Sequence, residues 1–150
     1  MDKVTLGWRE WLSLPDIGLE TIKAKVDTGA RSSALHTFEL DSFSEDGVAK
    51  VRFCIHPYQH DLSVVRTCVV PLFDERNVTD SGGHTELRPV IKTALQLGGI
   101  RKEIEITLTN RENMKFRMLL GRTAMAGDFC VDPQSSYLLG EPEKKSQPQG

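Results

Sequence analysis

The sequence predicts an all-β protein built from many short strands. Two stretches, residues 22–26 (IKAKV) and 48–55 (VAKVRFCI), alternate apolar and polar residues with a period of two. Such alternation is typical of a strand that buries one face. Turn-forming residues separate the apolar stretches, for example at 42–47 (SFSEDG) and at Gly98-Gly99. Together these features favour a small closed or sandwich-like barrel.

The first half of the chain supplies five of the expected strands and their turns. A proline after an apolar stretch ends a strand, so the N-terminal strand should stop at Pro15. In chain order we expect a strand at 4–14, a turn at 16–18, a strand at 22–26, a strand at 37–40, a turn at 42–47, and neighbouring strands at 48–55 and 64–70 joined by a polar connection at 56–61.

The second half should form hairpins and a short helix, followed by a disordered tail. Residues 140–150 (GEPEKKSQPQG) have almost no apolar side chain, so we expect one domain over 1–139 and disorder beyond it. In chain order we expect a segment at 73–79, a Gly-Gly hairpin tip at 81–84, strands at 87–97 and 100–109, a turn at 110–113, a core strand at 116–120, a short helix at 122–126, and short strands at 129–131 and 137–139.

Composition limits the class of protein. The chain has 150 residues, of which 39% are apolar and 27% charged, as in a soluble single domain. A formal net charge of −2 argues against direct nucleic-acid binding. No apolar run approaches the roughly 20 residues of a membrane helix, and MDKVTLGW lacks the apolar region of a signal peptide. Three cysteines, Cys54, Cys68 and Cys130, have no paired spacing, so we expect reduced, mostly buried thiols in a cytoplasmic protein.

The candidate chemistry lies in residues 22–36 (IKAKVDTGARSSALH). The expected strand runs into Asp27-Thr28-Gly29-Ala30, where glycine allows close backbone approach and lets the Asp27 carboxylate project from a tight loop. An isolated Asp of this kind can also serve only to cap a turn. Together with Leu119-Leu120-Gly121-Arg122, however, the motif resembles the aspartic proteases of the retropepsin type.

The wider pattern resembles a bacterial retropepsin-like family often labelled "ATP-dependent zinc protease". Its members are encoded beside ATP-grasp glutamate ligases that modify ribosomal protein S6. This resemblance implies an acid protease barrel, a peptide or protein substrate that is glutamate-rich or related to S6, and the ligase and S6 as partners. The matching segments are 7–10 (GWRE), 22–36, 81–91 (SGGHTELRPVI) and 108–122 (LTNRENMKFRMLLGR).

Aspartic-protease chemistry requires two carboxylates, and this chain has one Asp-Thr-Gly. One carboxylate acts as the base that deprotonates water, and the other as the acid that polarises the scissile carbonyl; held close together, the two share a proton. The sequence therefore predicts a homodimer with one Asp27 from each protomer. The resemblance implies that Thr28 braces the two loops, that Gly29 lies beside substrate, and that residues 119–121 pack behind the loop.

Substrate binding is expected at two places. Residues 81–84, which include Gly82, Gly83 and His84, form the candidate flap over the cleft, and an exposed hairpin tip without a role is the alternative interpretation. Ala30 and Arg31 should line the cleft beside Asp27.

Arg31 reverses the charge that is common in retropepsins after Asp-Thr-Gly-Ala. We expect an ion pair of Arg31 with Glu10 at the dimer base. Alternatively, Arg31 forms a basic lining with Arg88 and Arg122 that suits acidic peptides; the two roles are compatible.

No metal and no cofactor are expected, despite the family label. His56 and His60 are four residues apart with Pro57 between them, and there is no HExxH, CxxC or GxxxxGK[ST] motif. Three functions remain open: an aspartic endopeptidase, a catalytically weak adaptor for the glutamate ligase system, and a zinc-dependent hydrolase.

Overall fold

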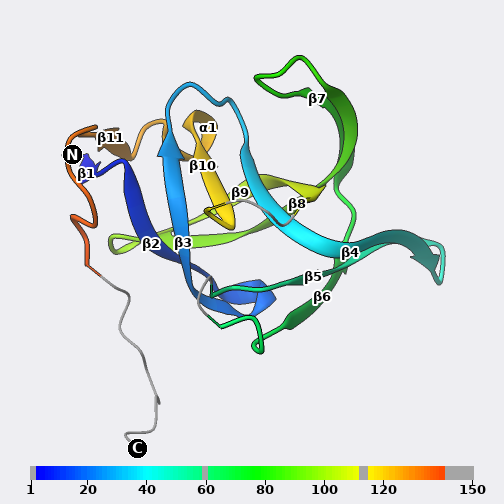
Figure 1. Cartoon of the computed structure of the whole chain (residues 1–150). Coiled ribbons are helices and arrows are strands. Elements are labelled where there is room, and N and C mark those ends of the chain that lie inside the picture. The colour runs from blue at the N-terminus through cyan, green and yellow to red at the C-terminus, as the bar shows by residue number, and fades with distance from the viewer. Residues whose placement is uncertain (1–2, 59–60, 112–114, 141–150) are drawn as a thin grey trace, which may run out of the picture.

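The computed structural model describes residues 3–58, 61–111 and 115–140, and confirms the predicted all-β fold with one short α-helix (Figure 1). Its elements are β1 (Val4–Leu6), β2 (Arg9–Leu14), the 3-10 turn η1 (Pro15–Ile17), β3 (Leu19–Asp27), β4 (Ser33–Glu45), β5 (Val48–Ile55), β6 (Arg66–Pro71), β7 (Asp74–Thr79), β8 (Thr85–Leu97), β9 (Ile100–Asn110), β10 (Met118–Gly121), α1 (Arg122–Met125) and β11 (Phe129–Val131).

The main sheet closes on itself. Its strands follow the order β10-β3-β2-β8-β9-β4, and β10 also pairs with β4, which completes a ring. The alternating side chains of these strands turn their apolar members inward, as the sequence pattern predicts. Burying each such side chain contributes about 1.5–3 kcal/mol to stability. The fully buried members include Leu12, Leu14, Ile22, Leu35, Ile91, Leu95, Ile106, Leu108, Met118 and Leu120.

β4 and β5 form a long hairpin whose far end projects away from the ring (Figure 1). The predicted turn at 42–47 is wrong in its extent, because strand pairing continues to Glu45 opposite Val48. Only Asp46 and Gly47 turn the chain, both with positive φ (52° and 78°). A two-residue turn of this kind matches the twist of the flanking strands, so the polar residues before it remain in the strand.

The expected N-terminal strand at 4–14 is divided into β1 and β2. A Cβ on Gly7 would lie 2.3 Å from the carbonyl oxygen of Ser135, so the chain breaks its strand where the C-terminal segment crosses it. β1 instead pairs in parallel with β11, as a separate two-stranded sheet. No helix in the described ranges is long and apolar enough to cross a membrane.

The predicted strand at 137–139 is wrong. Tyr137 has a φ of 52°, which turns the chain away from an extended path. The backbone N–H groups of Leu138 and Leu139 donate to the carboxylate of Glu10 rather than to a neighbouring strand. Of the expected tail, only Gly140 lies within the described residues.

Candidate active site

Asp27 is the last residue of β3, and its carboxylate is organised by its own loop. The backbone N–H of Gly29 donates to Asp27 Oδ1 at 2.9 Å. The N–H of Ala30 donates to the Asp27 carbonyl at 3.2 Å. Asp27 is half-buried, whereas Thr28 and Gly29 are exposed. The loop therefore presents one oriented carboxylate beside accessible backbone.

The start of α1 holds this loop from behind. Arg122 donates from its backbone N–H to the Ala30 carbonyl at 2.8 Å, and from Nη1 to the Gly29 carbonyl at 3.2 Å. Thr123 donates to the Arg31 carbonyl from both its N–H (3.1 Å) and its hydroxyl (2.8 Å). Three successive carbonyls of the loop are thus satisfied by two residues, which fixes its conformation.

β10 supports the loop as expected for the Leu-Leu-Gly motif. It runs parallel to β3, with Gly121 opposite Asp27. A Cβ on Gly121 would lie 2.5 Å from the carbonyl carbon of Ser32, so only glycine allows this approach. The fully buried Ser33 accepts the N–H of Gly121 on its hydroxyl at 3.0 Å. Sequence reasoning missed Ser33 and Thr123, because small hydroxyl residues near a turn carry no distinctive pattern.

A cavity of about 330 Å³ adjoins the loop on the side of β7 and β9. Arg31 projects from the loop into this region and makes no ion pair with any described residue. The other cations of the wall are neutralised: Arg76 pairs with Asp74 (2.9 Å) and Glu105 (2.6 Å), and Lys102 pairs with Asp128 (2.6 Å). The wall comprises Arg31, Ser32, Arg76, Lys102, Glu103, Ile104, Glu105, Thr107, Thr123 and Ala124.

The β7–β8 hairpin curls over the end of the molecule where β3 stops (Figure 1). Its tip is the predicted Gly-Gly turn, and Asp80 organises it by accepting the N–H groups of Gly82 and His84, both at 2.9 Å. These hydrogen bonds, led by the one from His84, hold the pKa of Asp80 below its usual value. Asp80 Oδ2 also lies 3.7 Å from Arg111 Nη2. His84 is exposed, so the tip is open to a ligand.

The predicted ion pair between Glu10 and Arg31 is wrong. Glu10 is fully buried, and its carboxylate accepts the N–H groups of Gly7 (2.7 Å), Leu138 (2.9 Å) and Leu139 (3.3 Å). A fully buried carboxylate that is occupied in this way makes no ion pair with the exposed Arg31 of the same chain. Glu10 instead anchors the C-terminal segment.

Arg88, another predicted cleft cation, is not among the residues that line the cavity beside Arg31. It is buried, and its Nε donates to Glu86 at 2.6 Å. Its charge acts on His36, whose pKa is lowered to about 4 by burial first and then by Arg88, Arg111 and Arg117. The structure thus places Arg31 at the cavity, Arg122 behind the loop, and Arg88 near His36 together with Arg111 and Arg117.

Among the described residues, no group of three His, Cys, Asp or Glu side chains comes together to hold a metal. His56 stacks on Phe38 with a centroid distance of 4.4 Å, and Cys54 donates to Glu39. His60 lies outside the described residues.

A ring-shaped β-sheet, with one Asp-Thr-Gly loop supported by Leu-Leu-Gly-Arg, defines a retropepsin-like protein. The chain belongs to the RimB-like family: the family model described as "Retropepsin-like aspartic endopeptidase RimB" matches residues 5–142.

Relatives place the domain in longer proteins. It is 43% identical over 140 residues to a protein of Shewanella pealeana named "Probable alpha-L-glutamate ligase", and 47% identical over 139 residues to one of Parasynechococcus marenigrum with the same name. Each match covers 93% of this chain but only 31% and 30% of the relative. This chain therefore spans about a third of the length of these curated relatives.

The fold is also similar to a crystal structure of a Legionella pneumophila protein of unknown function. The TM-score is 0.74 at 27% sequence identity, and the match covers 91% of this chain and 98% of that one.

Proposed function

We propose that this protein is an aspartic endopeptidase that works as a homodimer, with one Asp27 from each protomer. The observation that carries the proposal is the Asp27 loop. The backbone N–H of Gly29 orients the carboxylate, and Arg122 and Thr123 donate hydrogen bonds to the carbonyls of the loop. Gly121 packs against the backbone of Ser32 behind the loop. The family to which the chain belongs supports the same chemistry.

The reaction needs the second carboxylate from a partner copy, because the chain contains one Asp-Thr-Gly. Two facing Asp27 side chains would share one proton; the ionised one takes a proton from water, and the protonated one donates a hydrogen bond to the scissile carbonyl. In this proposal Thr28 braces the two loops, and the Gly82-Gly83-His84 tip covers the bound peptide.

The substrate we propose is an acidic peptide, rich in glutamate or derived from ribosomal protein S6. Arg31 supports this choice, since it is the cation of the cavity wall that has no ion-pair partner among the described residues. A guanidinium can hold a carboxylate through two parallel hydrogen bonds. The names of the relatives support a role beside a glutamate ligase. The buried free thiols of Cys54 and Cys68 suit a reducing cytoplasm.

Asp27→Asn tests the proposal. The variant should lose hydrolysis of a glutamate-rich peptide while keeping the melting temperature of the parent protein, and EDTA should leave parent activity intact. Asp41→Asn, on the β4–β5 hairpin, is the matched control. Full activity of Asp27→Asn would overturn the aspartic mechanism, and loss to chelator with recovery on zinc would favour a metal hydrolase instead.

A further inference from the structure

The outer face of β2 and β3 carries a ladder of cations and aromatic rings that the catalytic proposal does not use. Arg9 pairs with Lys25 across the two strands, and Trp11 pairs with Lys23. All four side chains point away from the buried core, because Glu10, Leu12, Ala24 and Val26 fill the inward positions between them. The cation–aromatic face consists of Trp8, Arg9, Trp11, Lys23, Lys25, Lys115, Phe116 and Tyr137.

The rings of this face hold its cations in place. The guanidinium carbon of Arg9 lies 4.6 Å from the ring centroid of Trp8 and 4.8 Å from that of Tyr137. Lys23 Nζ lies 5.7 Å from the Trp11 centroid and 5.6 Å from that of Phe116. Such contacts attract a cation to the ring without neutralising its charge.

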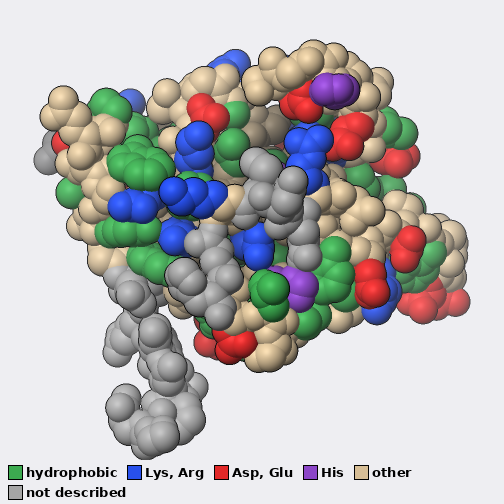
Figure 2. Space-filling view, viewed as in Figure 1, with side chains coloured by type: hydrophobic (Ala, Val, Ile, Leu, Met, Phe, Trp, Pro, Cys, Tyr) green, Lys and Arg blue, Asp and Glu red, His purple; other side chains and the backbone are tan. Residues whose placement is uncertain are grey.

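Among the described residues, no acidic side chain forms an ion pair with the strand cations of this face. None of Arg9, Lys23 and Lys25 forms an ion pair within the described ranges, although lysines elsewhere do, such as Lys50 with Glu45 and Lys102 with Asp128. Partial burial, together with the charges of Arg9 and Lys115, lowers the pKa of Lys23. In Figure 2 several lysine and arginine side chains are visible on the side of the molecule where β2 and β3 lie.

We propose that the cation–aromatic face is a docking surface for an extended acidic segment of a partner protein. Lys23 and Lys25 are two residues apart on one strand, about 6.6 Å at 3.3 Å per residue, which matches alternate side chains of an extended acidic peptide. A carboxylate placed there would relieve the mutual repulsion of the cations. This proposal does not depend on the catalytic one: the face would bind an acidic segment even if Asp27 were not catalytic.

The same geometry favours carboxylates over nucleic-acid bases. Trp11 stacks on Tyr137 with centroids 6.0 Å apart and an interplanar angle of 23°, and Trp8 meets Phe116 edge-on at 5.9 Å. The ring faces are thus occupied by one another and by Arg9 and Lys23, so they are not free platforms on which bases can stack. The groups of this face that can bind a ligand are therefore the ammonium and guanidinium groups, which attract carboxylates.

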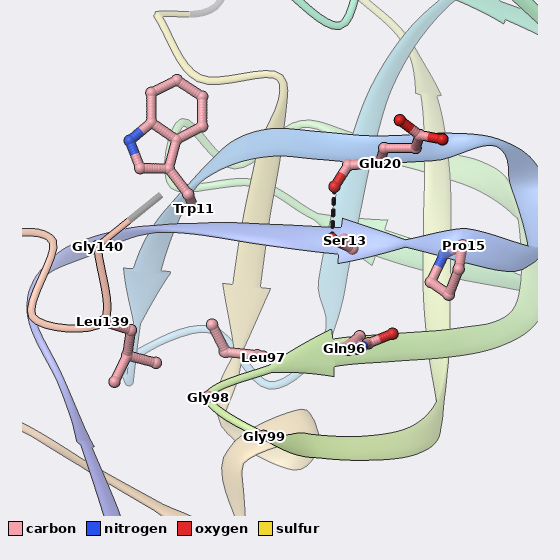
Figure 3. Close-up of a pocket in the computed structure, with 10 residues that line it drawn as sticks. All are labelled: Trp11, Ser13, Pro15, Glu20, Gln96, Leu97, Gly98, Gly99, Leu139 and Gly140. Atoms are coloured by element: carbon pink, nitrogen blue, oxygen red, sulfur yellow. Dashed lines mark hydrogen bonds between the residues drawn. The ribbon is translucent and has the colours of Figure 1, made fainter. Parts of the chain in front are cut away.

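A neighbouring cavity sets one limit of the surface. Trp11 borders a cavity of about 510 Å³ between β2, the Gly98-Gly99 turn and Leu139 (Figure 3). Glu20 and Pro15 lie at the end opposite Trp11, and Ser13 donates to the Glu20 carbonyl at 2.5 Å. The Glu20 carboxylate repels an acidic ligand, so the segment should run from Trp11 towards Lys25 and Arg9.

Tryptophan fluorescence reports this surface directly, because Trp8 and Trp11 are the two tryptophans of the chain. The Asp27→Asn protein, which cannot digest the probe in the proposed mechanism, is titrated with a short poly-L-glutamate. We expect a saturable change in emission that weakens with salt. Lys23→Glu and Lys25→Glu should each raise the Kd on the order of tenfold or more. Lys92→Glu is the control and should leave the Kd unchanged. Lys92 is exposed and lies outside the cation–aromatic face, with its Nζ 4.2 Å from the ring centroid of Phe73.

Three results would overturn the proposal. If Arg31→Glu abolishes the response while Lys23→Glu and Lys25→Glu do not, the peptide binds only at the Arg31 cavity. If single-stranded RNA binds more tightly than poly-L-glutamate, and Lys23→Glu raises the Kd for RNA to the same extent, the face binds nucleic acid instead. If sedimentation shows that Lys23→Glu and Lys25→Glu dissociate a dimer of the chain, the face is covered by a second copy.

Discussion

At the scale of single residues, the buried carboxylate of Glu10 decides how the two ends of the chain are joined. It receives three backbone N–H groups, one from the turn before β2 and two from the segment after β11. Hydrogen bonds to a charged acceptor are about twice as strong as those between neutral groups. Removing the acceptor leaves buried N–H donors without a partner, which lowers the stability of the fold.

Glu10→Gln should therefore lower the free energy of unfolding by about 2 kcal/mol, because its amide NH2 group would face a backbone donor. Denaturant unfolding measures this loss. Glu20→Gln is the matched control, since Glu20 is exposed on the adjacent strand and should change stability by less than about 0.5 kcal/mol. Equal effects of the two changes would contradict the anchoring role of Glu10.

His36 gives the folded state a dependence on pH. Its pKa is lowered from the ordinary value of 6.5 to about 4 by burial and by the nearby arginines. The unfolded chain therefore takes up a proton at this position near pH 6.5, while the folded chain resists until about pH 4, so stability falls as the pH drops through that window.

The loss from His36 alone should be on the order of 3 kcal/mol. Melting curves of His36→Gln should show a shallower fall of stability between these pH values than those of the parent protein. An unchanged slope in His36→Gln would show that His36 does not titrate in this way.

At the scale of elements, Asp80 determines the shape of the β7–β8 tip. Asp80→Ala removes the acceptor for two backbone N–H groups and the contact with Arg111. Hydrogen exchange at residues 81–84 should accelerate, and KM for the peptide substrate should rise on the order of tenfold while kcat changes less, if the tip covers bound substrate. Ser81→Ala is the control at the same tip. A rise in exchange without any change in KM would remove the flap from the mechanism.

Element patterns explain what could be predicted from the sequence. Alternation predicted β3 and β5, and the Gly-Gly pairs predicted the β7–β8 and β8–β9 hairpins, because these signals are local. The C-terminal segment was mispredicted as a strand, since its amides bind the distant side chain of Glu10. Because Glu10 is acidic, the sequence suggested it as an exposed partner for Arg31. Its burial depends on residues 138–139, which pack against Glu10 from far along the chain.

At the scale of the whole molecule, β1 and β11 pair within one protomer, and the ring closes through β10. The β1–β11 pairing thus needs no second chain, and the proposed dimer requires contacts that bring the two Asp27 loops together. Its second carboxylate remains the central requirement of the catalytic proposal, since the chain has one Asp-Thr-Gly.

Mixing parent protein with Asp27→Asn tests that requirement most directly. If two Asp27 side chains form each active site and the subunits exchange freely, activity at a fixed total concentration should follow the square of the parent fraction, so an equal mixture retains about one quarter of the activity. The Asp41→Asn control should leave the activity of the same mixture undiminished. Activity proportional to the parent fraction, about one half in the equal mixture, would show that each protomer acts alone and would contradict the shared carboxylate pair.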